Sequence, residues 1–117
     1  MKNTTQKGKE AENIACEFLQ NRGFVVLERN FFTPYGEIDI IAKDKEVLYF
    51  VEVKSGIGFE PVFNITKQKL GHLTKSMDYY LQKKRLSLPY CLSALILSKA
   101  QENEDYQIQW LENLTLF

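Results

Sequence analysis

The sequence has few of the residues on which disulfide-bonded, zinc-binding or secreted proteins depend. Only two of its 117 residues are cysteine, no CxxC or Cys/His cluster occurs, and His72 is the single histidine. These absences argue against a zinc site and indicate that Cys16 and Cys91 are reduced, packed thiols of a cytoplasmic protein. The apolar runs are too short to cross a bilayer, and the polar start MKNTTQKGKEAEN does not resemble a signal peptide, so we expect no membrane association.

Net charge is also absent, because 15 Lys and Arg residues balance 15 Asp and Glu residues. A net charge of zero argues against a strongly basic nucleic-acid-binding protein. The charges are nevertheless unevenly placed: residues 66–86 carry six basic residues and one acid, whereas residues 101–117 carry four acids and no base. On charge pattern alone, a solvated helix face explains the basic segment most simply.

No repeat, low-complexity tract or Pro/Gly-rich linker divides the chain, so we expect a single domain over residues 1–117. Hydrophobic periodicity predicts helices at residues 9–22 and 66–84, with Gly23 ending the first and Thr66 capping the second. Apolar runs predict strands at residues 24–31, 37–43, 47–54, 91–98 and 106–112. The order α-β-β-β-α-β-β indicates an α/β fold in which helices flank a central mixed β-sheet. Strands 37–43 and 47–54 should form an antiparallel hairpin, and the helix after them can return a parallel strand.

The predicted strand VLYFVEVK ends in two opposite charges, Glu52 and Lys54, where burial would favour apolar residues. Side chains alternate across a strand, so these two share one face of the sheet. On strand 37–43 the same alternation places Glu37, Asp39 and Ile41 on one face. The opposite face of that strand then carries Ile38, Ile40 and Ala42.

The position of the hairpin loop decides which of these residues pair. A loop at residues 44–45 pairs Glu37 with Glu52, whereas a loop at residues 45–46 pairs Asp39 with Glu52. Directly paired residues point to the same side of a sheet. Either loop therefore brings all four charged side chains, three acids and a lysine, to one face.

Carboxylates that face each other on a half-buried patch are unfavourable unless a partner neutralises them. Lys54 can neutralise one of them, and a divalent cation would neutralise the rest. Mg²⁺ takes hard oxygen ligands, commonly one or two carboxylates, which fits Asp39 and Glu52. Glu12, at the border of the apolar face of the first helix, is the acid of that helix best placed to join them. The alternative is that these acids are solvated strand ends and an ordinary boundary residue.

Asp39, followed by Glu52-Val53-Lys54 on the next strand, resembles the PD-(D/E)XK nuclease signature. The longer segment GEIDIIAKDKEVLYFVEVK, residues 36–54, resembles the core motif of the YraN-like family of uncharacterised bacterial proteins. That family is itself similar to archaeal Holliday junction resolvases and restriction-type endonucleases. The neutral segment SGIG after Lys54 departs from the family, in which a basic residue often follows.

The resemblance extends to both predicted helices. AENIACEFLQNRGF resembles the first helix of the family, with Glu12 as its acid, and ITKQKLGHLTKSMDYYL resembles the second, with Lys69 as its lysine. Arg29-Asn30 matches the Arg-Asn pair that precedes the GEID segment. The similarity therefore covers residues 8–81 well and the remainder loosely.

The resemblance implies a restriction-endonuclease-like fold and an endonuclease that hydrolyses phosphodiester bonds of nucleic acid with Mg²⁺ or Mn²⁺. Asp39 and Glu52, with Glu12, would hold the ion, and Glu37 would orient these ligands or act as an outer one. Lys54 would orient or deprotonate the attacking water. Phosphates flanking the cut would meet three lysines, Lys67, Lys69 and Lys75. The implied partner is DNA, with branched DNA as one candidate substrate, and a homodimer is open because resolvase-like enzymes that cut two strands usually dimerise.

Two other functions fit the sequence. The zero net charge and the neutral segment after Lys54 favour a nucleic-acid-binding module with a catalytically degenerate nuclease fold. An acidic C-terminal segment with three aromatic residues, Tyr106, Trp110 and Phe117, would instead suit a protein-interaction domain. For those aromatic residues, packing in the core or anchoring of the chain end is the simpler expectation.

Overall fold

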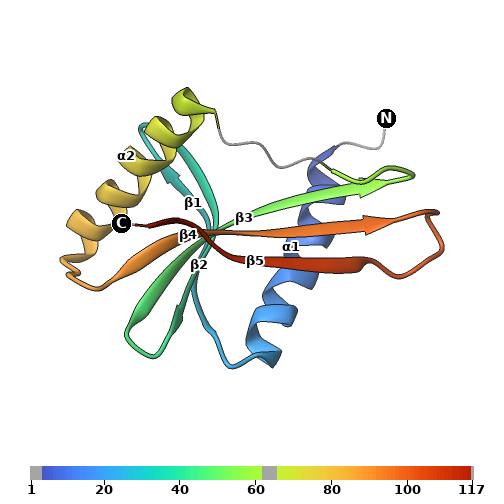
Figure 1. Cartoon of the computed structure of the whole chain (residues 1–117), viewed down its shortest axis with the longest axis horizontal. Helices are drawn as coiled ribbons and strands as arrows, with labels where there is room; N and C mark the ends of the chain where they lie inside the picture. The colour runs from blue at the N-terminus through green and yellow to red at the C-terminus, as the bar shows by residue number, and fades with distance from the viewer. Residues whose placement is uncertain (1–3, 62–65, 117) are drawn as a thin grey trace.

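The computed structural model describes residues 4–61 and 66–116 (Figure 1). Within these ranges the chain forms α1 (Thr4–Asn21), β1 (Val25–Thr33), β2 (Gly36–Asp44), β3 (Val47–Ile57), α2 (Lys67–Lys84), β4 (Tyr90–Lys99) and β5 (Gln107–Leu116). The order α-β-β-β-α-β-β expected from the sequence is confirmed. The strands lie in one sheet in the order β1-β2-β3-β4-β5, with β3 and β4 parallel and the other neighbours antiparallel. The expected mixed sheet, of the restriction-endonuclease-like type, is therefore present.

The two helices cover opposite faces of this sheet and bury separate apolar clusters. Ala11, Ala15 and Leu19 of α1 pack on one face against alternate residues of β2, β3 and β4. Leu73, Met77 and Tyr80 of α2 pack on the other face. Figure 1 shows α1 and α2 on either side of the central strands. Both helices thus take the positions that their apolar stripes, spaced three and four residues apart, require.

The first helix ends where the sequence predicts, at a glycine. Gly23 has φ 92° and its N–H donates to the Gln20 carbonyl at 3.0 Å, while the Phe24 N–H donates to the Leu19 carbonyl at 3.0 Å. This pair of bonds satisfies carbonyls at the helix end and requires the left-handed conformation that glycine adopts without strain. The helix begins earlier than expected, at Thr4 rather than Lys9.

The second helix is capped as predicted. The Thr66 side chain accepts a hydrogen bond from the Lys69 N–H at 3.1 Å. This bond satisfies one of the four N–H groups that a helix start leaves without an intrahelical partner. At the other end Arg85 adopts the left-handed conformation, with φ 53°, and its N–H donates to the carbonyls of Gln82 and Leu81 in the last turn.

The β2–β3 hairpin takes the second of the two expected registers. Asp44 pairs with Val47, so that residues 45–46 form the loop, and Lys45 has φ 56°. The pairing of Glu37 with Glu52 that a loop at residues 44–45 would give is wrong. A two-residue loop favours positive φ, and here Lys45 adopts it although it is neither glycine nor asparagine.

Strict alternation along β2 is also wrong. Ile38 packs with Ile41 in the cluster under α2, whereas Ile40 packs in the cluster under α1. The neighbouring strand turns at the same level, because Asn30 of β1 has φ 51°. As a result, Arg29 reaches α1, while Phe31 packs under α2. The left-handed residue in β1 and the accompanying twist of β2 replace the regular pleat that the sequence pattern predicted.

The structure also bears on the expectations about the cysteines, membrane-spanning segments and C-terminal aromatic residues. Cys16 and Cys91 are both free and buried. No helix within residues 4–61 and 66–116 is long and apolar enough to cross a membrane. Trp110 packs against Phe24 with ring centroids 5.7 Å apart, and Tyr106 joins the same apolar cluster, so core packing is confirmed for both. Phe117 lies outside the described residues.

Candidate functional site

The candidate site lies where β2 separates from β3. Their ladder runs from Asp44–Val47 to Ile40–Val51, and beyond it β3 continues beside β4 alone. At this point the Val53 N–H donates to Oδ2 of Asp39 at 2.8 Å. The Asp39 carboxylate thus accepts the hydrogen bond that a backbone carbonyl of β2 would accept if the β2–β3 pairing continued. This bond fixes Asp39 at the mouth of the gap between the two strands.

Three carboxylates meet around this position. Ligand atoms of Glu12 from α1 and of Glu37 and Asp39 from β2 all lie within 4.8 Å of one another. Glu37 is exposed, whereas the other two are half-buried. Since such a group of acids repels itself without a cation, the arrangement is suited to a divalent ion, and carboxylate oxygens are the ligands that Mg²⁺ prefers.

Asn30 holds two of these acids together. Its Nδ2 donates to Oε1 of Glu12 and to Oε1 of Glu37, both at 2.8 Å. One amide nitrogen carries two N–H groups, so a single side chain can position both carboxylates. Sequence reasoning gave Asn30 no role. The available signal was the residue type, because asparagine is among the few residues other than glycine that adopt positive φ readily.

The electrostatics of the site shift two of the three predicted metal ligands, Asp39 and Glu52, toward the protonated form. Burial raises the pKa of Asp39 from 3.8 to about 6, aided by the neighbouring acids and opposed by the Val53 N–H and by Lys54. Burial, followed by the charge of Asp39, raises the pKa of Glu52 from 4.5 to about 8. Glu52 is only 8% exposed. Both shifts are those expected of acids that share a mostly buried site, in which the nearby lysines offset only part of the cost of burial.

One oxygen of Glu52 shows that the residues fit a cation. Its Oε1 is buried and has no hydrogen-bond partner among the residues that the structure describes. A buried carboxylate oxygen without a partner is unfavourable, and a divalent ion or its bound water would satisfy it. Glu52 lies outside the group of three acids, which contains Glu37 instead. The geometry therefore brings Glu37 closer to the ligand group than the sequence suggested, and the ligand set itself stays a prediction.

Two lysines face the acids. The charges of Lys54 on β3 and Lys69 on α2 both lower the pKa of Glu52, and Lys54 also lowers that of Asp39. Burial, followed by the charge of Lys54, lowers the pKa of Lys69. Lys69, expected to contact flanking phosphates, thus lies within the charged site itself. The arrangement places two cations beside Asp39 and Glu52, which is a suitable setting for proton transfer.

The other two predicted phosphate contacts lie on the outer surface of α2. Lys67 and Lys75 are exposed. The Nζ of Lys75 lies 5.6 Å from the centroid of the Tyr35 ring, beside the turn that joins β1 to β2. The structure therefore places one of the two, Lys75, next to the hairpin that carries Glu37. Neither belongs to the group of three acids, and contact of either with a nucleic acid stays a prediction.

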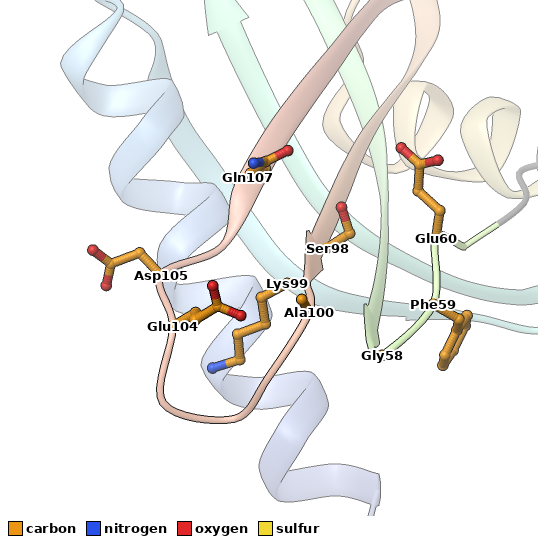
Figure 2. A pocket seen from close by; sticks show the side chains of 9 residues that line it. All are labelled: Gly58, Phe59, Glu60, Ser98, Lys99, Ala100, Glu104, Asp105 and Gln107. Atoms are coloured by element: carbon orange, nitrogen blue, oxygen red, sulfur yellow. The ribbon is translucent and has the colours of Figure 1, made fainter.

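A surface hollow of about 360 Å³ lies elsewhere, at the ends of β3 and β4 (Figure 2). Its lining includes Phe59, Glu104 and Asp105, and none of the acids of the candidate site. The lysine in this lining, Lys99, lies 4.4 Å from the ring centroid of Tyr106 and donates to the Glu102 carbonyl at 3.0 Å. This hollow is thus separate from the chemistry at the β2–β3 gap.

Comparison with known proteins identifies the family of the chain. The model of the uncharacterised protein family UPF0102 matches residues 11–97, a range that contains every residue of the candidate site. A UPF0102 protein of Wolinella succinogenes is 48% identical over 110 residues, covering 94% of this chain and 96% of its own length. A UPF0102 protein of Helicobacter hepaticus is 47% identical over 114 residues, covering 97% of this chain and 98% of its own.

A third relative, from Helicobacter pylori strain HPAG1, is 46% identical over 109 residues, covering 93% of this chain and 90% of its own. The expectation that the chain belongs to an uncharacterised bacterial family is confirmed. The chain is a member of the uncharacterised protein family UPF0102.

Proposed function

We propose that this protein is a metal-dependent nuclease that hydrolyses phosphodiester bonds. The observation that carries the proposal is the position of Asp39 and Glu52, two acids with raised pKa values at the gap between β2 and β3, with Lys54 beside them. Strongly perturbed acids gathered with a lysine are characteristic of catalytic sites. An acid on one strand and the Glu-Val-Lys sequence on the next also reproduce the PD-(D/E)XK pattern that the sequence resembles.

The acids would hold Mg²⁺ or Mn²⁺, which when bound would polarise the scissile phosphate and acidify a water molecule. Asp39 is the central ligand candidate, with Glu12, Glu37 and Glu52 around it. These acids come from α1, β2 and β3, so the site depends on the packing of α1 against the two strands. Asn30 orients Glu12 and Glu37 through its two hydrogen bonds.

Lys54 is the candidate for proton transfer and charge stabilisation. It follows Glu52 by two residues on β3 and therefore shares its face. Its charge acts on both Asp39 and Glu52. An ammonium group at this place can orient the attacking water and stabilise the negative charge that develops on the phosphate. Lys69 adds a second cation at the same site and can share either role.

The substrate proposed is nucleic acid, with DNA favoured by the resemblance and branched DNA as one candidate. Exposed lysines on α2 can contact phosphates on either side of the cut, and such contacts make binding weaken as salt concentration rises. Two-strand cleavage of a junction would need a homodimer, which we propose only for that substrate. A location in the cytoplasm, where such a substrate and Mg²⁺ occur together, is part of the same proposal.

Cleavage of a panel of labelled single-stranded, duplex and branched substrates tests this function. The wild-type protein should cleave at least one of them with Mg²⁺ or Mn²⁺ and none with a chelator. Lys54→Ala should lose at least about 100-fold in cleavage rate, the scale on which removing one proton-transfer group acts. Lys9→Ala, on the exposed face of α1, is the matched control and should cleave like the wild type.

The other functions make different predictions in the same experiment. A catalytically degenerate binding module would bind nucleic acid in chelator, in a salt-dependent way, and cleave nothing with either metal. The zero net charge and the neutral segment 55–58 are the features that favour it. A protein-interaction domain would bind neither metal nor nucleic acid. Equal cleavage by the wild type and Lys54→Ala would overturn the assignment of Lys54.

A further inference from the structure

The end of the β1–β2 hairpin carries two exposed aromatic side chains that the proposed chemistry does not use. Phe32 is 72% exposed and Tyr35 is 46% exposed. Burial of an aromatic ring contributes more to stability than burial of most other side chains. A ring that remains mostly exposed on a strand is therefore a candidate for contact with a ligand. Neither residue has a role that the sequence pattern predicts.

Phe32 stands directly beside the group of acids. It is the register partner of Glu37, and directly paired residues of an antiparallel ladder point to the same side with Cβ atoms about 5 Å apart. The preceding pair, Phe31 and Ile38, packs under α2, so that Phe32 and Glu37 face the side of α1, where Glu12 lies. Phe32 is thus a direct neighbour of the group of acids on the same face of the hairpin.

The hairpin end is held in a fixed position. The Thr33 hydroxyl donates to the Gly36 carbonyl at 2.8 Å and accepts from the Tyr35 N–H at 3.0 Å. It also lies 2.9 Å from the hydroxyl of Ser76, a buried residue of α2. Figure 1 shows this turn beside α2. A hairpin end that is already ordered loses little conformational entropy when a ligand binds to it, which favours binding.

The surrounding charges indicate which ligand suits this ring. Lys75 lies 5.6 Å from the ring centroid of Tyr35, so a cation is present at the same hairpin end. Phe32 itself is paired with Glu37, one of the acids that are suited to a divalent ion. A ligand that meets an aromatic face beside such a group of acids should carry a flat ring together with phosphate. Nucleotides of a nucleic-acid strand have both.

We propose that Phe32 is a stacking platform for an unpaired base of the substrate, next to the bond that is cut. The inference rests on the proposed nuclease function and specifies its substrate class: strands with unpaired bases, such as single strands, flaps or junction ends. Bases within a duplex stack on each other and present only their edges, so an aromatic face can stack only on a base that is unpaired. Intact duplex should therefore be the poorer ligand.

Binding in chelator tests the platform separately from cleavage. The probes are a single-stranded oligonucleotide containing 2-aminopurine and a fully paired duplex of the same sequence, at one fixed low salt concentration. Phe32→Ala should weaken single-strand binding by roughly 5- to 100-fold, the effect of losing one base–aromatic stack, and should reduce quenching of the 2-aminopurine fluorescence. Duplex binding should change less than 2-fold.

Two further variants show whether the effect is specific. Phe32→Trp should retain single-strand affinity and quenching because indole also stacks, whereas Phe32→Leu should behave like Phe32→Ala. Phe59→Ala, which removes a ring 63% exposed at the hollow of Figure 2, is the matched control and should bind like the wild type. Thermal denaturation checks that each variant is folded, as expected for changes at exposed positions.

The outcomes separate this inference from the proposed function. Phe32-dependent binding of single strands without cleavage of any substrate would support the platform and overturn the nuclease. Cleavage that depends on Lys54, combined with single-strand binding that Phe32→Ala leaves unchanged, would overturn the platform alone. Equal losses on single strand and duplex would also overturn it, because a phosphate contact rather than stacking would then explain the effect.

Discussion

Replacing Glu52 with glutamine should stabilise the metal-free protein and remove part of its pH dependence. Burial and the nearby charge of Asp39 raise the pKa of Glu52 from 4.5 to about 8. Between these two pH values the folded protein holds a proton that the unfolded chain has released. Stability of the metal-free protein therefore falls as the pH rises from about 4.5 to 8. Glutamine has a similar shape and no charge, so the variant lacks this contribution.

The size of the effect follows from the same pKa values. At pH 7 the solution is about 2.5 pH units above the ordinary glutamate pKa of 4.5, and each unit corresponds to about 1.4 kcal/mol. The wild type should thus be less stable than Glu52→Gln by up to roughly 3 kcal/mol at pH 7. For a chain of 117 residues, this corresponds to a difference in Tm of about 10 °C. Near pH 4 the two proteins should be almost equally stable.

Chemical denaturation in chelator at half-unit steps from pH 4 to pH 8 measures this difference. Glu17→Gln, at an exposed position of α1, is the matched control and should follow the wild type at every pH. Parallel pH profiles for the wild type and Glu52→Gln would refute the reasoning. Glu52 would then be no more costly to ionise in the folded protein than in the unfolded chain, and the need for a cation at the site would lose its main physical support.

Three further predictions concern the metal and the framework of the site. Apparent Mg²⁺ affinity, measured by calorimetry, should rise between pH 6 and pH 8 because Asp39 and Glu52, with pKa values of about 6 and 8, must lose protons to bind the ion; equal affinities would contradict this. Asn30→Ala should lower the free energy of unfolding by about 1–3 kcal/mol, since it removes two hydrogen bonds and places alanine at φ 51°. Asn30→Gly should lower the free energy of unfolding by less, because glycine adopts this φ without strain. An unchanged Tm for both variants would argue against a role of Asn30 in holding Glu12 and Glu37 together. Gly56→Ala should destabilise by about 1–3 kcal/mol because its Cβ would lie 2.8–2.9 Å from an aromatic ring and a carbonyl. Gly71→Ala, in an open part of α2, should stabilise the protein by about 0.5–1 kcal/mol. A stabilising Gly56→Ala with a destabilising Gly71→Ala would contradict the packing around these two glycines.

Local chemistry made most of the fold predictable. Gly23 and Thr66 ended and capped their helices where the sequence indicated, because each bond involved joins residues close together in the chain. The start of α1 was missed by five residues, since the segment TTQKGKE carries no apolar residue to reveal a period. The hydrophobic pattern predicted the order of helices and strands and the mixed sheet correctly. It predicted the first and last residues of these elements less accurately.

The candidate site was predictable to the extent that it depends on strand parity. Glu52 and Lys54 share a face by the two-residue period alone, and either hairpin loop brings Asp39 toward them. What the sequence could not show depends on contacts between distant segments. The left-handed conformation of Asn30 and the twist of β2 at Asp39 bring Glu37 to Glu12, and the docking of α2 places Lys69 against Glu52.

Cleavage of a labelled single-stranded oligonucleotide by the wild type and by Asp39→Asn, in Mg²⁺ and in chelator, tests directly whether Asp39 holds a catalytic ion. Asparagine retains an oxygen that can accept the Val53 N–H, so the fold should persist while the central ligand loses its charge. We expect Mg²⁺-dependent cleavage by the wild type and its loss in a folded Asp39→Asn protein. Equal cleavage by the two proteins, or cleavage by the wild type that persists in chelator, would contradict this expectation.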